Sequence, residues 1–198
     1  MKFKFKIQKY QADAVEATAD VFAGQPNRTA KYTRDVGTRR DRQAMLFESA
    51  VGERNAEIEL SDDRLLDNIR SVQSRYDIPR NEELVRVAGL GKCSLDIEME
   101  TGTGKTYVYV KTMFELNKRY GWNKFIVVVP SIAIREGVKK SFSMLEDHFM
   151  ETYGKKARYF VYSSVNLTQI DSYSQDAGLN VMIINTQAFA SSFKEGAC

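Results

Sequence analysis

The run Met99-Glu-Thr-Gly-Thr-Gly-Lys-Thr106 constrains this chain more than any other feature of its sequence. It follows the strand-like segment Cys93–Glu98 and precedes a helical pattern that begins at Lys105. A strand that feeds a glycine-rich turn, and a turn that opens a helix, direct several backbone N–H groups at one point, which suits a polyphosphate. The run therefore predicts a nucleotide-binding loop of the Walker A kind; the alternative is a glycine turn that binds nothing.

Each residue type in this loop has a chemical task. Gly102 and Gly104 let the backbone approach a phosphate with no Cβ in the way. Lys105 is expected to reach the β- and γ-phosphates, and the hydroxyl of Thr106 is expected to bind Mg²⁺, so both are candidate catalytic residues. The candidate nucleotide contacts in the loop are Thr101, Gly102, Thr103, Gly104, Lys105 and Thr106.

Composition narrows the class of protein without identifying a partner. Lys and Arg number 29 against 26 Asp and Glu, and a net charge of +3 is too small to indicate nucleic acid. Cys93 and Cys198 lie far apart without metal-ligand spacing, which fits a reducing compartment. No apolar stretch approaches the length of a membrane span, and the lysine-rich start lacks the apolar region of a secretion signal. We therefore expect a cytoplasmic protein that makes no contact with a membrane.

The segments before the loop show mixed patterns. Alternation of Lys with Phe and Ile predicts a strand at Met1–Ile7, and helical spacing predicts a helix at Lys9–Ala23 that ends at Gly24. Residues Asn27–Arg42 show no pattern and are rich in basic side chains, which fits either a phosphate-binding loop or a solvated flexible one. Its basic residues are Arg28, Lys31, Arg34, Arg39, Arg40 and Arg42.

A hairpin and a helix are predicted next. Gln43–Phe47 and Ala56–Leu60 resemble its two strands, around turn residues Gly52–Asn55. Ser61 or Asp62 can cap the helix that follows. Its apolar face consists of Leu65, Ile69, Val72 and Tyr76.

Strands and helices alternate after the loop. The predicted elements are the helix Lys105–Tyr120 ended by Gly121, the strand Phe125–Val129, the helix Ala133–Phe149, and the strands Arg158–Tyr162 and Leu179–Ile184, with a polar stretch at Asn166–Asp176 between the last two. The β-branched run Phe125–Val129 is typical of a strand that is buried on both faces of a parallel sheet. Together these elements predict an α/β layer sandwich with a mainly parallel sheet and right-handed crossovers.

Several separate stretches resemble one family. They are Asp96–Thr106, Phe125–Val138 and Ile183–Phe189, joined by Tyr10–Val15 and the turn Gly24–Pro26. The core Thr-Gly-Thr-Gly-Lys-Thr lacks the leading glycine of the strict Walker pattern, because Met99 stands at that position. A core without the leading glycine is the form that superfamily 2 helicases use. The whole set resembles the restriction (Res) subunit of type III restriction-modification enzymes, which are relatives of DEAD/DEAH-type helicases. The resemblance implies a partial RecA-like P-loop NTPase fold, with residues 27–80 as a variable insertion that carries the hairpin and helix.

The resemblance also implies roles for individual residues. It assigns Gln11 to a motif in which the side-chain amide hydrogen-bonds adenine and selects ATP; an exposed helix residue is the alternative. Mg²⁺ is the expected metal. Pro130, Ser131 and Arg135 match a motif that contacts DNA phosphates, although Arg135 could instead pair with Glu136. Thr186 and Gln187 match the next DNA-contacting motif, or form an ordinary strand-to-helix turn.

A family member of this kind is expected to be a DNA endonuclease with an ATP-driven motor. Its implied partners are double-stranded DNA and a methyltransferase/specificity (Mod) subunit. No acidic Asp-Glu-x-His-like box follows Ile184, and no second RecA-like or nuclease domain is recognisable, so we expect an amino-terminal portion of a larger enzyme that is inactive in isolation. The alternatives are a stand-alone nucleotide-binding or interaction module without turnover, or another superfamily 2 DNA helicase.

Overall fold

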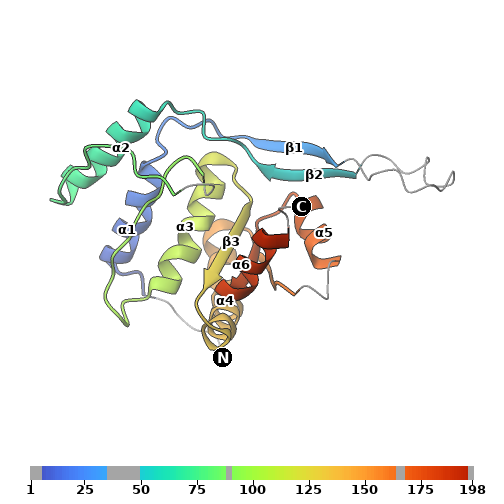
Figure 1. Cartoon of the computed structure of the whole chain (residues 1–198). Coiled ribbons are helices and arrows are strands. Elements are labelled where there is room, and N and C mark those ends of the chain that lie inside the picture. The colour runs from blue at the N-terminus through green and yellow to red at the C-terminus, as the bar shows by residue number, and fades with distance from the viewer. Residues whose placement is uncertain (1–5, 35–49, 88–90, 164–167, 196–198) are drawn as a thin grey trace. The chain divides into compact units, whose positions relative to one another are not determined.

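The structure, a computed structural model, describes residues 6–34, 50–87, 91–163 and 168–195. These residues fall into two units. The first unit takes the described parts of residues 1–27 and 57–121, and the second takes those of residues 28–56 and 122–198. Figure 1 shows the helices and strands in order along the chain. The predicted α/β class with a parallel sheet is confirmed.

The first unit is helical. It holds α1 (Lys9–Asp20), α2 (Asp62–Arg75) and α3 (Lys105–Tyr120). The predicted cap of α2 is confirmed, because the Ser61 hydroxyl accepts a bond from the Arg64 N–H at 3.2 Å. On the predicted apolar face, Leu65 and Ile69 are buried. Glycine ends α3 as expected, since Gly121 has a φ of +76°, which a side chain disfavours.

Helix α1 packs between α2 and α3 through polar contacts at its carboxyl end. The Asp20 carboxylate accepts bonds from Arg75 at 2.6 Å and Arg119 at 2.8 Å. The Tyr120 hydroxyl donates to the Ala19 carbonyl at 2.8 Å. These bonds fix the end of α1 against the end of α3, and so set the helix that carries Gln11 beside the helix that opens at the loop.

The segment before the phosphate loop differs from the prediction. Cys93–Glu98 forms no strand, although its residues favour one. A strand is stable only beside a neighbour that pairs with its backbone, and no described strand runs next to this segment. Its Ser94 N–H donates to the Val85 carbonyl at 2.8 Å instead. The loop is thus preceded by a segment that belongs to no helix or strand.

A parallel sheet forms the centre of the second unit. Its strands are β3 (Lys124–Val129), β4 (Arg158–Val161) and β5 (Asn180–Asn185), in the order β3-β5-β4. The sheet is accompanied by α4 (Ile132–Tyr153), α5 (Thr168–Gln175) and α6 (Thr186–Glu195). Lys124 and Arg158 both pair with Asn180, so the three strands begin at one edge and end at the other.

Two neighbouring rings on β4 show that α4 and α5 cover opposite faces of the sheet. Tyr159 stacks on Phe142 of α4 with ring centroids 5.1 Å apart. Phe160, the next residue, meets Tyr173 of α5 edge to face at 5.8 Å. Successive side chains of a strand point to opposite faces, so the two helices lie on different sides. This is the predicted layered arrangement.

The predicted hairpin exists, but other residues form it. Its strands are β1 (Thr29–Arg34) and β2 (Ala50–Asn55), paired antiparallel with Tyr32 opposite Gly52. The predicted turn Gly52–Asn55 therefore lies inside a strand, and Ala56–Leu60 forms no strand. The alternation of Thr29, Lys31 and Thr33 with Ala30 and Tyr32 fits a strand, although the basic residues around it suggested a loop.

Other expectations also change. The polar stretch Asn166–Asp176 contains the helix α5, which was not predicted. Strand β3 is not buried on both faces, because Ile126 and Val128 are 49% and 41% exposed. Ile7 lies in no strand, and the rest of the first predicted strand falls mostly outside the described residues, as do Gln43–Phe47 and the arginines Arg39, Arg40 and Arg42.

Candidate functional site

The phosphate loop is a tight turn that favours glycine at two positions. Gly102 and Gly104 have φ values of +84° and +89°, in the left-handed region. Between them, the N–H and the hydroxyl of Thr103 both donate to the Glu100 carbonyl, at 3.4 and 2.6 Å. The loop therefore closes on itself and delivers the chain directly into α3 at Lys105.

The start of α3 supplies donors for an anion. The N–H of Val108 donates to the Gly104 carbonyl at 3.1 Å. This is the first backbone hydrogen bond of the helix. The N–H groups of Lys105 and Thr106 lie before Val108, in the first turn, where an α-helix has no carbonyl four residues back inside the helix. These N–H groups, the positive end of the helix dipole and two glycines without Cβ atoms fit a triphosphate.

Lys105 and Thr106 lie where the sequence predicts them. Lys105 is exposed, and its Nζ donates to the Met99 carbonyl at 2.5 Å across the loop. Thr106 is half-buried in the first turn of α3. Burial raises the pKa of the neighbouring phenols Tyr107 and Tyr109, so neither adds negative charge beside the loop. Among the described residues, no three His, Cys, Asp or Glu side chains cluster as a metal site. Binding of Mg²⁺ by the Thr106 hydroxyl stays a prediction.

The first helix reaches the loop through two side chains. The Nε2 atom of Gln11 donates to the Thr103 carbonyl at 2.8 Å, and the Tyr10 hydroxyl donates to the same oxygen at 3.2 Å. The sequence predicted Gln11 as a nucleotide contact, and the structure places it beside the loop. Tyr10 was not predicted, because no local pattern shows that its hydroxyl meets a residue 93 positions away.

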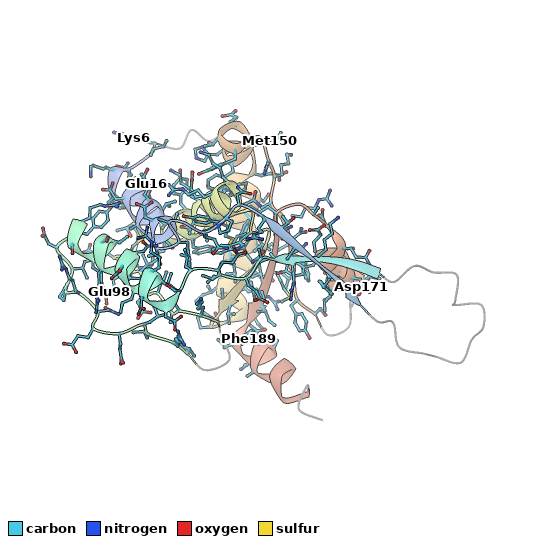
Figure 2. The ribbon with its side chains drawn as sticks, turned by 90° about the horizontal axis from the view of Figure 1, so that it is seen from above. Lys6, Glu16, Glu98, Met150, Asp171 and Phe189 are labelled. Carbon is cyan, nitrogen blue, oxygen red and sulfur yellow. The ribbon has the colours of Figure 1, made fainter. Side chains whose placement is uncertain are left out.

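The DNA-contacting candidates lie in the second unit, at the carboxyl edge of its sheet. Val129 and Asn185 are paired as the last residues of β3 and β5. Pro130 and Ser131 follow the first strand, while Thr186 and Gln187 follow the second, and all four are exposed. In Figure 2, Phe189 on α6 and Met150 near the end of α4 lie far apart, because α6 begins at this edge and α4 runs away from it. The structure thus brings these four residues to one edge.

Two of the candidates have defined partners. The Ser131 hydroxyl accepts a bond from the Ile134 N–H at 3.3 Å and caps α4, which leaves its own O–H proton available. Arg135 pairs with Glu136 at 3.2 Å and is 21% exposed. The alternative in which Arg135 pairs with an acid is therefore the arrangement seen, and a phosphate contact by Arg135 stays a prediction.

No helix among residues 6–34, 50–87, 91–163 and 168–195 is both long and apolar enough to cross a membrane.

Comparison with known proteins places the chain in a family. Residues 4–196 match the family described as "Type III restriction enzyme, res subunit". The Res subunit of the EcoP15I enzyme of Escherichia coli is 38% identical over 112 residues, which is 56% of this chain and 11% of that protein. The EcoPI Res subunit of Escherichia phage P1 is 37% identical over 112 residues, again 56% of this chain and 11% of the relative. The StyLTI Res subunit of Salmonella typhimurium is 47% identical over 64 residues, 31% of this chain and 6% of the relative. The chain thus matches only 6 to 11% of the length of these proteins. It belongs to the family of type III restriction enzyme res subunits.

Proposed function

We propose that this chain supplies the ATP-binding part of a DNA translocase that serves type III restriction. The observation that carries the proposal is the loop at Gly102–Thr106, where two glycines with a left-handed backbone lead directly into the amino-terminal, positive end of α3. Membership of the res-subunit family supports a helicase-like ATPase role in restriction. Movement along DNA, cleavage by the whole protein and association with a Mod subunit are parts of the proposal.

The loop residues would share the work of holding the nucleotide. On nucleotide binding, the Lys105 ammonium would leave the Met99 carbonyl and bind the β- and γ-phosphates. The change is favourable because a charged acceptor replaces a neutral one. The hydroxyl of Thr106 holds Mg²⁺, and the N–H groups at the start of α3 hold phosphate oxygens. When bound, Mg·ATP supplies the phosphoanhydride bond whose hydrolysis drives the motor. Gln11 offers the adenine ring its Oε1 and its second Nε2 hydrogen.

The carboxyl edge of the sheet would hold the DNA backbone. Helices α4 and α6 both begin at this edge, directly after paired strand ends. Each helix start carries the partial positive charge of its helix dipole, which attracts phosphate. The hydroxyls of Ser131 and Thr186 and the amide of Gln187 add polar contacts that carry no base preference. Double-stranded DNA therefore fits this edge through its phosphates.

Phosphate release by the full-length protein tests the proposal. We expect DNA to stimulate release, and Lys105→Ala to lower the DNA-stimulated rate by about 100-fold or more, as loss of a charged transition-state contact does. Lys118→Ala is the control, since Lys118 is an exposed lysine near the other end of α3. Binding of ATP without turnover in the full-length protein would favour a nucleotide-binding module instead. The 198 residues alone are expected to bind Mg·ATP weakly, if at all, and not to hydrolyse it. Phosphate release by these residues that Lys105→Ala abolishes would contradict that expectation.

A further inference from the structure

Tyr10 and Gln11 converge on one oxygen atom of the phosphate loop. Their donors lie 3.2 and 2.8 Å from the Thr103 carbonyl oxygen, and this oxygen has two lone pairs to accept them. We propose that Tyr10 and Gln11 are positioning residues that set the conformation of the loop, so that they strengthen binding of a triphosphate whatever base it carries. This inference rests on the proposed function, in which the loop binds the triphosphate of ATP.

The planarity of the peptide bond links this oxygen to the binding surface. The carbonyl of Thr103 and the N–H of Gly104 belong to one trans peptide unit, so they point in opposite directions. Two bonds that hold the carbonyl toward α1 therefore hold the Gly104 N–H away from α1. Thr103 sits between the two glycines of the loop, whose backbones have the widest choice of conformation. Without the two bonds, this peptide unit can rotate and its N–H loses a fixed direction.

The neighbouring glycine is shaped for this contact. A Cβ atom at Gly104 would lie 2.5 Å from Gln11 Nε2, which is closer than a Cβ atom approaches any neighbour in folded proteins. The absent side chain therefore makes room for the Gln11 amide as well as for a phosphate. A Cβ at Gly102, by contrast, would meet nothing within 4 Å. The close approach is specific to the glycine beside the bonded carbonyl.

Gln11 retains hydrogen-bonding capacity after this contact. An amide has two N–H donors and one carbonyl acceptor, and the Thr103 carbonyl uses one donor. The remaining groups suffice for adenine, so base recognition and loop positioning are separable functions of one side chain. A ligand without a base separates them by experiment.

The test measures binding of Mg²⁺-bound inorganic triphosphate to the full-length protein by calorimetry, beside ATP and GTP. Gln11→Met keeps the length of the side chain and removes its donor, and Tyr10→Phe removes only the hydroxyl. We expect Gln11→Met to weaken triphosphate binding about fivefold and Tyr10→Phe about twofold, as loss of single hydrogen bonds does. Gln8→Met is the control, since Gln8 lies one turn earlier and its side chain makes no cap bond to α1. Melting curves of each variant show whether it is folded.

The outcomes are distinct. If Gln11→Met and Tyr10→Phe bind inorganic triphosphate like the unaltered protein, the positioning role is wrong, and a reduced preference for ATP over GTP in Gln11→Met would make Gln11 a base contact alone. If Lys105→Ala also leaves triphosphate binding unchanged, the loop is not the phosphate site and the proposed function itself fails. Equal losses in Gln8→Met and Gln11→Met would likewise overturn the positioning role, because they would indicate a general weakening of α1.

Discussion

Gly104 and Gln11 approach each other so closely that a Cβ atom on the glycine would lie 2.5 Å from the Gln11 Nε2 atom. The two residues are 93 positions apart in the sequence. They are close because Gln11 donates to the carbonyl of Thr103, the residue before Gly104. The backbone of Gly104 is also left-handed, with a φ of +89°. Two separate physical effects thus oppose any side chain at this position, and they can be measured separately.

The first prediction separates these two effects. Gly102→Ala and Gly104→Ala both place alanine at a positive φ, which costs about 1 kcal/mol of stability. Only Gly104→Ala also displaces the Gln11 amide, so it should destabilise the chain by about 1 kcal/mol more than Gly102→Ala does. Urea unfolding without nucleotide measures both. In a Gln11→Ala background the two glycine variants should become equally stable; if the difference persists, the contact with Gln11 is not its cause.

The second prediction concerns acid stability of the helical unit. Burial raises the pKa of the Asp20 carboxyl, but hydrogen bonds from Arg75 and Arg119 outweigh burial and hold the pKa below its ordinary value. A carboxyl with a depressed pKa contributes stability above its unfolded pKa, near 4, and loses that contribution as the pH falls through its folded pKa. Asp20→Asn should therefore cost on the order of 1 kcal/mol at pH 7, after allowance for solvent screening, and almost nothing in strong acid.

Unfolding of Asp20→Asn across the range from pH 7 to pH 2 measures this effect. Asp67→Asn is the matched control, since Asp67 is an exposed residue in the middle of α2. The control should lose less stability at pH 7 than Asp20→Asn does. An Asp20→Asn variant that keeps the full pH dependence would show that the two arginine bonds contribute nothing.

Local residues account for much of the fold that the sequence predicts. Helix α3 begins and ends at glycines that need positive φ, and Ser61 caps α2, so both limits depend on chemistry within a few residues. Alternating strands and helices after Gly121 predict the parallel sheet for the same reason. In contrast, Cys93–Glu98 has the composition of a strand, but whether it becomes one depends on a neighbour that composition does not supply.

Three further features of the structure differ from the sequence-based expectations: the contact of α1 with the loop, strand β1 and helix α5. They depend on distant contacts or on weak local patterns. The bonds of Tyr10 and Gln11 to Thr103 join residues more than 90 positions apart, so no window of sequence shows them. Strand β1 was missed because its basic residues suggested a loop, although its alternation was visible. Helix α5 had a local indication, since Thr168 followed by Asp171 resembles a capping box. Strand β1 and helix α5 are therefore predictable from the local sequence, whereas the contacts with Thr103 are not.

The third prediction concerns Asn55, whose side chain binds the backbone at the start of β3. Its Oδ1 accepts bonds from the N–H groups of Asn123 and Lys124, both at 2.8 Å, and its Nδ2 donates to the Lys124 carbonyl at 2.7 Å. Asn55→Ala leaves these part-buried groups without partners, so it should destabilise the chain by about 2–3 kcal/mol. Asn27→Ala removes one exposed bond to Lys118 and should cost below about 1 kcal/mol. Equal losses in urea unfolding would contradict the role of Asn55.

The last prediction tests the DNA edge with a matched pair of helix caps. Ser131 caps α4 and Ser61 caps α2. Each hydroxyl oxygen accepts one bond from the N–H three residues on, at 3.3 and 3.2 Å. Ser131→Ala and Ser61→Ala should therefore destabilise the protein alike, by about 1 kcal/mol. If the Ser131 edge binds phosphate, only Ser131→Ala should reduce DNA-stimulated phosphate release in the full-length protein, by a factor of about 3 to 10.

Ser131→Asp sharpens the comparison, because aspartate restores the cap while its negative charge repels phosphate. It should match the unaltered protein in unfolding, bind DNA more weakly than Ser131→Ala, and show a larger loss at low salt than at high salt. Full DNA stimulation in Ser131→Asp would remove this edge from the DNA-binding surface.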